Sequence, residues 1–289
     1  MCRLFGMTAA PRRVRATFWL LDAPDSLARQ SRREPDGAGL ATFGPTGAPR
    51  VRKQPLAAYE DRQFAMEARE CASTTFVAHI RYASAGPVEP RNTHPFEQRG
   101  RVFAHNGVLD GLDTLDAELG EYRELVEGET DSERLFALIT KRIDRRDGDV
   151  TTGIADAAIW VAENLPVYAM NLVFATANEL WALRYPATHE LFVLERAAGG
   201  RHGRRHLEHA SPAGTVRARS GDLAVFPAVV VASERMDEDP GWQPVRPGEL
   251  VHVDDRLVVR HEMILPGPPR YPLSLDQLGM RAAASQVSI

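Results

Sequence analysis

The chain has 289 residues, of which 44% are hydrophobic and 26% charged, a composition typical of a globular protein with one large core or two smaller ones. This composition excludes a disordered, collagen-like or coiled-coil chain. With 35 Lys and Arg against 39 Asp and Glu, the formal charge is −4, so no nucleic acid and no membrane surface is expected as the main partner. Apolar runs stop well short of the ~18 residues of a membrane span, and we expect a cytoplasmic protein.

The predicted elements follow a mixed order along the chain. Taken in turn, they are a strand at 4–7, a helix at 14–30, a strand at 38–43, a helix at 61–69, strands at 75–80 and 102–104, helices at 131–145 and 153–164, and strands at 171–176, 180–183, 191–194, 223–232, 249–253 and 257–259. Regular alternation of strand and helix is missing. The order therefore predicts an α+β fold with stacked sheets and helices outside.

One domain accounts for most of the chain. We expect it to span residues 1–265, because no long linker divides this part. The Gly-, Arg- and His-rich stretch 197–214 is predicted to be a surface loop. Residues 266–289 begin Pro-Gly-Pro-Pro and become rich in Ser and Ala, which predicts a mobile tail.

Two cysteines, Cys2 and Cys71, give no disulfide framework and no metal-ligand spacing. Cys71 precedes an apolar strand, where a buried, unreactive thiol is the simplest interpretation. Cys2 follows the initiator Met, and a small second residue permits removal of Met1, which leaves a cysteine with a free α-amino group. That amine has an unperturbed pKa of about 7.7–8.0 and the thiol one of about 8.5, so the amine can accept the thiol proton. Cys2 is a candidate nucleophile with its own base, although an exposed N-terminal cysteine could equally be accidental.

Polar residues after two predicted strands are candidate ligand groups. Arg81 follows the strand at 75–80, where its guanidinium either forms a structural ion pair or binds a ligand carboxylate. Asn106 and Gly107 follow the strand at 102–104, and Asn-Gly is a strong signal for a type I′ hairpin turn. The alternative is an oxyanion hole, in which the Asn106 amide and the Gly107 N–H each contribute roughly 2.7–4 kcal/mol to a developing anion.

Residues Thr130 to Glu133 match a capping box, with Thr130 as N-cap and Glu133 reaching back to it. Asp131 is then either a first-turn acid that complements the helix dipole or a carboxylate that holds a substrate ammonium. One residue can do both, because a capped helix start fixes the carboxylate in its charged form.

The remaining histidines give weaker signals. His79, His94 and His105, together with Asn92, are expected to be buried or to support the site. A metal cluster at 202, 206 and 209 is considered and set aside, because the only acid in this Arg-rich loop is at position 208, so no metal and no other cofactor is expected.

Taken together, these segments resemble the class II glutamine amidotransferases, whose glutaminase domain is an N-terminal-nucleophile hydrolase. The matching segments occur in the family's order: Met1-Cys2, Asp36-Gly-Ala-Gly-Leu-Ala41, His79-Ile-Arg-Tyr-Ala-Ser84, Asn92-Thr-His-Pro-Phe96, His105-Asn-Gly107, Glu129-Thr-Asp-Ser-Glu133, Val231-Ala-Ser-Glu234 and Val245-Arg-Pro-Gly-Glu-Leu-Val251. Two positions differ from branches of the family. Ala85 stands where the amino-sugar synthases have a His, and Ala38 where compact hydrolases related to the ergothioneine pathway usually have a Trp.

The resemblance covers residues 2–261 and implies a four-layer αββα sandwich, which agrees with the α+β prediction. It also implies a role for each matching residue: Cys2 as nucleophile with its freed amine as base, Arg81 assisted by Ser84 as the ligand of an α-carboxylate, Asp131 as the ligand of an α-ammonium, and Asn106 and Gly107 as oxyanion donors.

The expected reaction is hydrolysis of the γ-glutamyl amide of glutamine, or of a small γ-glutamyl compound, through a thioester on Cys2. About 260 residues resemble the glutaminase domain, which leaves no room for a second catalytic domain that uses ammonia. A second hypothesis is a glutaminase subunit that passes ammonia to a separate synthase. A third is an inactive binding module that senses glutamine-like ligands.

Overall fold

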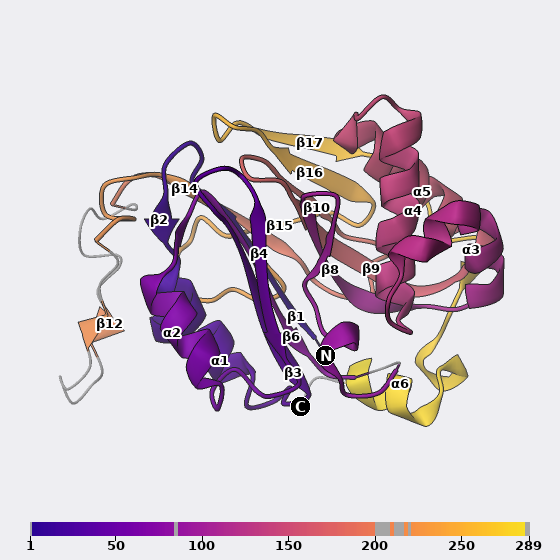
Figure 1. Cartoon of the computed structure of the whole chain (residues 1–289), viewed down its shortest axis with the longest axis horizontal. Coiled ribbons are helices and arrows are strands. Elements are labelled where there is room, and N and C mark those ends of the chain that lie inside the picture. Colours follow the sequence, from indigo (N-terminus) through magenta and orange to yellow (C-terminus); the bar gives the residue numbers. More distant parts are fainter. Residues whose placement is uncertain (1, 84–85, 200–208, 211–216, 219–220, 287–289) are drawn as a thin grey trace.

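Two large sheets lie face to face in the computed structural model, which describes residues 2–83, 86–199, 209–210, 217–218 and 221–286 (Figure 1). In spatial order the first sheet contains β15 (Gln243–Pro244), β11 (Phe192–Arg196), β14 (Ala228–Ala232), β1 (Arg3–Thr8), β6 (Thr75–Arg81), β3 (Gly37–Phe43) and β4 (Pro49–Gln54). The second contains β17 (Val259–Met263), β16 (Glu249–Val253), β10 (Leu180–Leu183), β9 (Pro166–Ala175), β8 (Arg101–Leu109) and β7 (Phe96–Gln98), and β18 (Tyr271–Pro272) pairs with β9.

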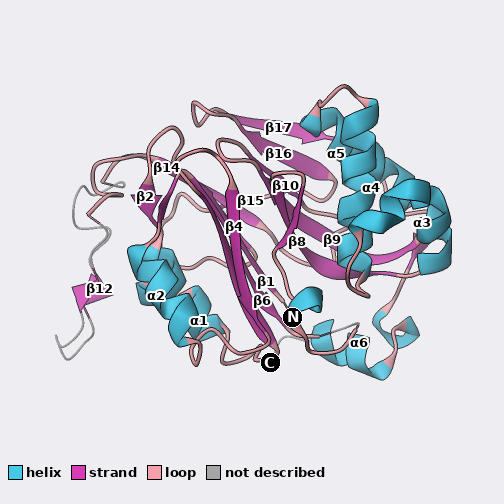
Figure 2. Ribbon diagram, in the orientation of Figure 1, coloured by secondary structure: helices cyan, strands magenta, loops and turns pink. Residues whose placement is uncertain are grey.

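Helices cover the outer face of each sheet (Figure 2). The helices are α1 (Leu27–Gln30) and α2 (Arg62–Glu70) beside the first sheet, α3 (Leu112–Leu119), α4 (Asp131–Arg145) and α5 (Val150–Asn164) beside the second, and α6 (Met280–Gln286) near the C-terminus. Two small ribbons complete the described strands: β2 (Val14–Arg15) pairs with β5 (Ala72–Ser73), and β12 (His209–Ala210) pairs with β13 (Arg217–Ala218).

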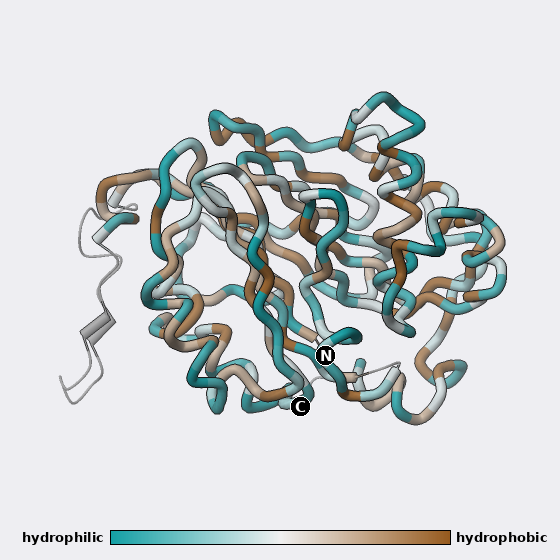
Figure 3. The backbone as a smooth tube through the Cα atoms, viewed as in Figure 1, coloured by the Kyte–Doolittle hydropathy of each residue, from teal (hydrophilic) through white to brown (hydrophobic). Residues whose placement is uncertain are grey.

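Three hydrophobic cores separate the four layers. Strand residues alternate between the two faces of a sheet, so Phe5 of β1 packs toward the helices of the first sheet, whereas Leu4 packs between the sheets. In the second sheet, Phe174 of β9 packs toward α4 and Val173 packs between the sheets. Figure 3 shows the matching pattern, with hydrophobic residues along the strands and hydrophilic residues at the connecting loops. The predicted α+β, four-layer αββα architecture is confirmed.

The helix α4 begins and ends where the sequence predicts, at Asp131 and Arg145. The hydroxyl of Thr130 accepts a hydrogen bond from the N–H of Glu133 at 3.2 Å, as expected of an N-cap. The prediction that Glu133 reaches back to Thr130 to complete the capping box is wrong. The carboxylate of Glu133 accepts instead from the N–H groups of Glu127 (3.2 Å) and Gly128 (2.6 Å), so it organises the loop before the helix.

The helix predicted at 14–30 is divided into three parts. Residues Val14–Arg15 form β2, Phe18–Asp22 form one π-helical turn, and Leu27–Gln30 form α1. The chain breaks at Ala23 because this residue precedes a proline and adopts an extended conformation (φ −54°, ψ 154°). Proline also limits the strand predicted at 223–232, since β14 begins at 228, directly after Pro227.

The C-terminal segment beyond residue 265 contacts the second sheet. Arg270 N–H donates to Ala162 O at 2.8 Å, and Leu273 N–H donates to Val167 O at 2.9 Å. Between them, β18 pairs in parallel with the first residues of β9. None of the helices in the described part of the chain has the length and apolar character needed to cross a bilayer.

Candidate active site

Cys2 lies directly before β1, the middle strand of the first sheet. The β1–β6 register pairs Leu4 with His79 and Arg3 with Ile80, so one further step places Cys2 opposite Arg81. Leu4 and Val77 pack between the two sheets. Cys2 lies two residues from Leu4 and Arg81 lies four residues from Val77, so each belongs to the same face of its strand. Alternation therefore directs Cys2 and Arg81 into the space between the sheets, at one end of the sandwich.

The Cys2 thiol is held by the backbone of the residue after Arg81. Tyr82 N–H donates to Cys2 Sγ at 3.2 Å, and Sγ lies 3.3 Å from Tyr82 O. Cys2 is buried, and this burial raises the pKa of its thiol, while the Tyr82 N–H and the charge of Arg81 act in the opposite direction. A thiol with a raised pKa is protonated at neutral pH, so its nucleophilic use requires a base.

An ion network around the buried Arg3, not singled out in the sequence, supports the Cys2 backbone. Arg3 Nη1 donates to Cys2 O at 3.4 Å, and the same guanidinium pairs with Glu34 (3.5 Å) and Glu234 (2.7 Å). Glu234 belongs to the Val-Ala-Ser-Glu segment of β14 and its following turn, in which Ser233 exchanges two hydrogen bonds with Leu4. The sequence signal that could have indicated this network is Arg3, a charged residue at the start of the apolar strand β1.

Arg81 is almost completely buried, at 3% exposure, and burial is the main cause that lowers the pKa of its guanidinium. Asp36 and Asp131 are among the groups whose negative charges oppose this shift, as does Cys2. Asp36 is fixed beside it, since Asp36 N–H donates to Arg81 O at 3.1 Å and the Asp36 carboxylate accepts from Ala83 N–H at 2.9 Å. Sequence reasoning gave Asp36 no role, although it begins one of the matching motifs.

Asn92 joins two loops at the edge of this cluster. Its Nδ2 donates to Pro87 O at 3.3 Å, where Arg81 Nη1 also donates at 3.2 Å, and its Oδ1 accepts from Glu129 N–H at 2.9 Å. Asn92 thus connects the loop after Arg81 to the loop that precedes α4. The predicted ligand Ser84 lies outside the described residues.

Asn106 and Gly107 lie within β8, so the hairpin-turn interpretation is wrong. Asn106 pairs with Asn171, and Gly107 with Met170, in the long β8–β9 ladder, which continues the strand beyond the predicted end at 104. Asn106 Nδ2 donates to Cys2 O at 3.0 Å. An Asn amide carries two N–H groups, so one remains for a second acceptor beside Cys2.

Gly107 is required at its position by close packing of two backbones. A Cβ atom there would lie 1.9 Å from Ala169 O and 2.8 Å from His105 Nε2. Any side chain would therefore push β8 away from β9 and move the Asn106 amide relative to Cys2. The role of both residues as oxyanion donors stays a prediction.

Asp131, the first residue of α4, connects the helix to the end of β8. Its Oδ2 accepts from Leu109 N–H at 2.9 Å, and its Oδ1 accepts from Ser132 N–H at 2.9 Å. Ser132 Oγ lies 3.3 Å from Asp131 Oδ1 and 2.9 Å from His105 Nδ1. This chain of contacts fixes the Asp131 carboxylate while leaving it lone pairs for an ammonium group.

His79 and His94 form a buried ring pair with centroids 4.2 Å apart. Burial lowers the pKa of His79 to about 3 and places the pKa of His94 well below its ordinary value, with nearby positive charges acting in the same direction. His105 is also buried, and burial lowers its pKa. The three side chains are neutral at pH 7, which suits supporting residues.

Within the described residues, no cluster of His, Cys, Asp or Glu has the arrangement of a metal site. Positions 202 and 206 of the histidine-rich loop lie outside those residues, so the prediction about that loop is untested. Cys71 is half-buried instead of buried, because it terminates α2 near the molecular surface.

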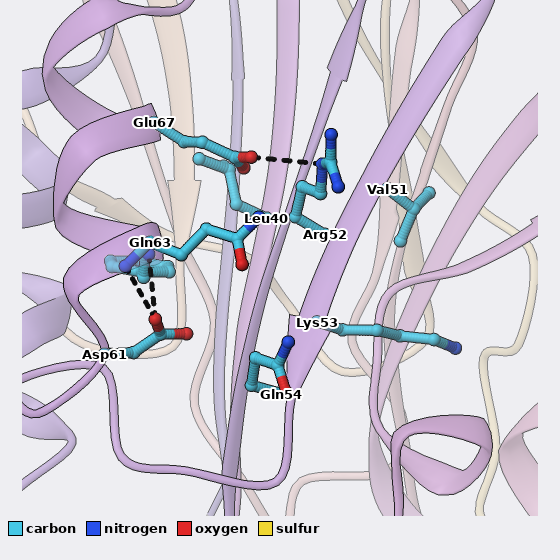
Figure 4. A pocket seen from close by; sticks show the side chains of 9 residues that line it. Leu40, Val51, Arg52, Lys53, Gln54, Asp61, Gln63 and Glu67 are labelled. Atoms are coloured by element: carbon cyan, nitrogen blue, oxygen red, sulfur yellow. Dashed lines mark hydrogen bonds and ion pairs between the residues drawn. The ribbon is translucent and has the colours of Figure 1, made fainter.

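A separate polar cavity of about 200 Å³ lies between α2 and β4 (Figure 4). Its charged groups have structural partners: the Asp61 carboxylate accepts from Gln63 and Phe64 N–H, and Arg52 pairs with Glu67 at 3.2 Å. Lys53 of β4 points away from this cavity and lies 4.6 Å from the Phe96 ring centroid. None of the predicted site residues is among those that line the cavity.

Comparison with known sequences gives a consistent assignment. A family model described as "Glutamine amidotransferases class-II" matches residues 1–264. The chain is 34% identical over 220 residues to an uncharacterised protein of Methanocaldococcus jannaschii, covering 72% of this chain and 57% of that protein. It is 29% identical over 270 residues to the gamma-glutamyl-hercynylcysteine sulfoxide hydrolase of Mycolicibacterium smegmatis, covering 90% of this chain and 98% of that protein.

Solved structures show the same fold. A glutamine phosphoribosylpyrophosphate amidotransferase from B. subtilis superposes with a TM-score of 0.63 at 20% identity, covering 92% of this chain and 50% of that one. A glutamine aminotransferase class-II domain protein from Silicibacter pomeroyi superposes with a TM-score of 0.58 at 20% identity, covering 92% of this chain and 100% of that one. The similarity therefore spans about half of the larger relatives and the whole of the smaller ones.

Proposed function

This chain belongs to the class II glutamine amidotransferases, and we propose that it hydrolyses the γ-glutamyl amide bond of glutamine or of a small γ-glutamyl compound. The observation that carries the proposal is the convergence of Cys2, Arg81 and Asn106 at one end of the inter-sheet space. A buried thiol, a buried cation and an amide donor are the groups needed to attack an amide, hold a carboxylate and stabilise an oxyanion. The 29% identity to a named γ-glutamyl hydrolase over most of both chains supports the same class of substrate.

The first half of the proposed reaction forms a thioester. After removal of Met1, the α-amine of Cys2 accepts the thiol proton and Sγ attacks the γ-carbonyl carbon of the substrate. The remaining N–H of the Asn106 amide and the N–H of Gly107 stabilise the oxyanion. The ammonium form of the Cys2 amine then protonates the leaving nitrogen, and the C–N bond breaks to release ammonia or an amine.

The second half regenerates the enzyme. Water loses a proton to the Cys2 amine and attacks the thioester carbonyl at the same oxyanion site, and the C–S bond breaks to release glutamate and the thiol. Throughout both halves, the Arg81 guanidinium holds the α-carboxylate and the Asp131 carboxylate holds the α-ammonium. Two charges at fixed positions orient the γ-carbonyl toward Sγ.

The test is an assay of the purified protein alone against glutamine and a panel of γ-glutamyl amides, with glutamate release as the common readout. We expect turnover of at least one compound and its loss in Cys2→Ala, with an unchanged circular dichroism spectrum. Turnover that persists in Cys2→Ala would refute the proposal.

The same assay separates the two alternatives. A glutaminase subunit for a separate synthase would be nearly idle alone and would gain activity when that partner is added. An inactive sensor would bind glutamine without releasing glutamate. The subunit alternative draws support from relatives that continue beyond the matched region: this chain covers 50% of the B. subtilis amidotransferase and 57% of the Methanocaldococcus protein.

A further inference from the structure

The C-terminal segment reaches the same end of the sandwich as Cys2. It is anchored at β18, which pairs with Pro166 and Val167 at the start of β9. This start of β9 lies opposite the end of β8 that follows Asn106. Figure 1 shows α6 at this end of the molecule, below the start of β1.

The last described residues of α6 are buried, and Gln286 contacts His189. Ser285 is fully buried and Gln286 is 5% exposed, and Gln286 Oε1 lies 2.7 Å from His189 Nε2. The carbonyl of His189 accepts from Asn171 Nδ2 at 3.4 Å, and Asn171 is the cross-strand neighbour of Asn106. One end of α6 is thus connected to the strand beside the oxyanion candidate.

The first turn of α6 contacts the loop that follows Arg81. Arg281 Nη1 donates to Gly86 O at 3.3 Å, and Arg81 Nη1 donates to Pro87 O at 3.2 Å. Two guanidinium groups therefore hold consecutive carbonyl oxygens of one loop. Burial is the largest cause that lowers the pKa of Arg81, and the positive charge of Arg281 is a further one, which agrees with the proximity of the two residues.

Two guanidinium groups close together repel each other, and an anion that binds between them is attracted to both. Arg81 is buried and Arg281 is exposed, so the two residues contact this loop from the buried and the solvent-exposed side of the molecule. We infer that Arg281 is a second carboxylate-binding arginine, and that α6 closes the end of the glutamyl pocket that holds the substrate's α-carboxylate. This inference rests on the proposed function, because it assigns a specificity-determining residue to that pocket.

The inference is tested by ligand binding, which needs no turnover. In a full-length Cys2→Ala background, calorimetry compares L-glutamine with L-glutamine amide, whose α-carboxylate is replaced by a carboxamide. Arg281→Gln is expected to raise the dissociation constant of L-glutamine about tenfold and to leave that of L-glutamine amide unchanged. The tenfold effect corresponds to one charge-assisted hydrogen bond, weakened because Arg281 is exposed to solvent. The L-glutamine affinity of Arg281→Lys is expected to lie between those of the parent and of Arg281→Gln, because Lys keeps the positive charge but lacks the planar guanidinium.

The matched control is Arg270→Gln, which removes the same charge from the same segment. Arg270 is exposed, and its guanidinium lies over the Tyr271 ring, 5.3 Å from the centroid. L-Glutamine affinity should be unchanged in this variant, and both variants should keep the parent's melting temperature.

The outcomes separate this inference from the proposed function. Equal affinity of Arg281→Gln and its parent for L-glutamine would overturn the inference alone. An equal loss of affinity for L-glutamine and L-glutamine amide would also overturn it, since Arg281 would then only hold the loop in place and would not contact the α-carboxylate. A Cys2→Ala parent that binds neither ligand, together with a native protein that releases no glutamate, would overturn the proposed function and the inference together.

Discussion

Replacing Gly107 with Ala perturbs the proposed oxyanion site without removing any polar group. The new Cβ would lie 1.9 Å from Ala169 O and 2.4 Å from Ala169 C, and real Cβ atoms stay beyond about 3.0 Å, so β8 must move by about 1 Å. Both obstructing atoms are backbone atoms of β9, which cannot rotate away. A displacement of this size costs about 100-fold in rate when it moves a group that must meet a transition state.

The stability cost of the same change should be roughly 1–3 kcal/mol, the range for overpacking a well-packed site. The assay therefore measures kcat for glutamate release and the urea midpoint of each variant. Gly44→Ala is the control, because its Cβ would meet nothing closer than 3.6 Å. A folded Gly107→Ala protein whose kcat stays within about threefold of the parent would refute the assignment of an oxyanion site to this strand.

Three further predictions concern charge and protonation. Asp131→Asn should raise the KM for glutamine about 10- to 100-fold, because it removes the charge from the ammonium ligand, and should have little effect on an analogue that lacks the α-amine. The kcat/KM should rise with pH through about 7.7–8.0 as the α-amine of Cys2 loses its proton; a profile that is flat from pH 6 to 9 would contradict an amine base. Protein stability should fall as pH is lowered from about 6.5 to about 3, because the unfolded chain protonates His79 in this range and the folded chain does not. His79 alone accounts for roughly 4–5 kcal/mol of this loss, and urea titrations of His79→Asn should show a shallower pH dependence, whatever the variant's stability at pH 7.

Elements with complete local signals could be predicted from the sequence. The helix α4 has an N-cap at Thr130, an apolar face and a basic last turn, and its predicted bounds agree with the structure. Local signals failed where tertiary pairing decides the conformation. Asn106-Gly107 has the sequence of a turn, but pairing of β8 with β9 keeps it extended.

The candidate site was predictable as a set of residues and not as a geometry. Cys2, Arg81 and Asn106 could be chosen because each brings a distinct chemical group next to an apolar strand. Their approach depends on strand register, which places Cys2 opposite Arg81 across a sequence separation that no local pattern encodes. Contacts from distant segments, such as Arg3 with Glu234 and Arg281 with Gly86, could not be foreseen for the same reason.

The central claim is that Cys2, with its own freed amine, carries the γ-glutamyl group. Intact-mass measurement of active protein, acid-quenched during turnover of glutamine or the best γ-glutamyl substrate, tests it most directly. The account predicts a main species without Met1 and a second species heavier by one γ-glutamyl group. Peptide mapping should place this group on Cys2, and prior alkylation of Cys2 should prevent its formation. Fully active protein that retains Met1, or an adduct that maps to Cys71 or to any residue other than Cys2, would contradict it.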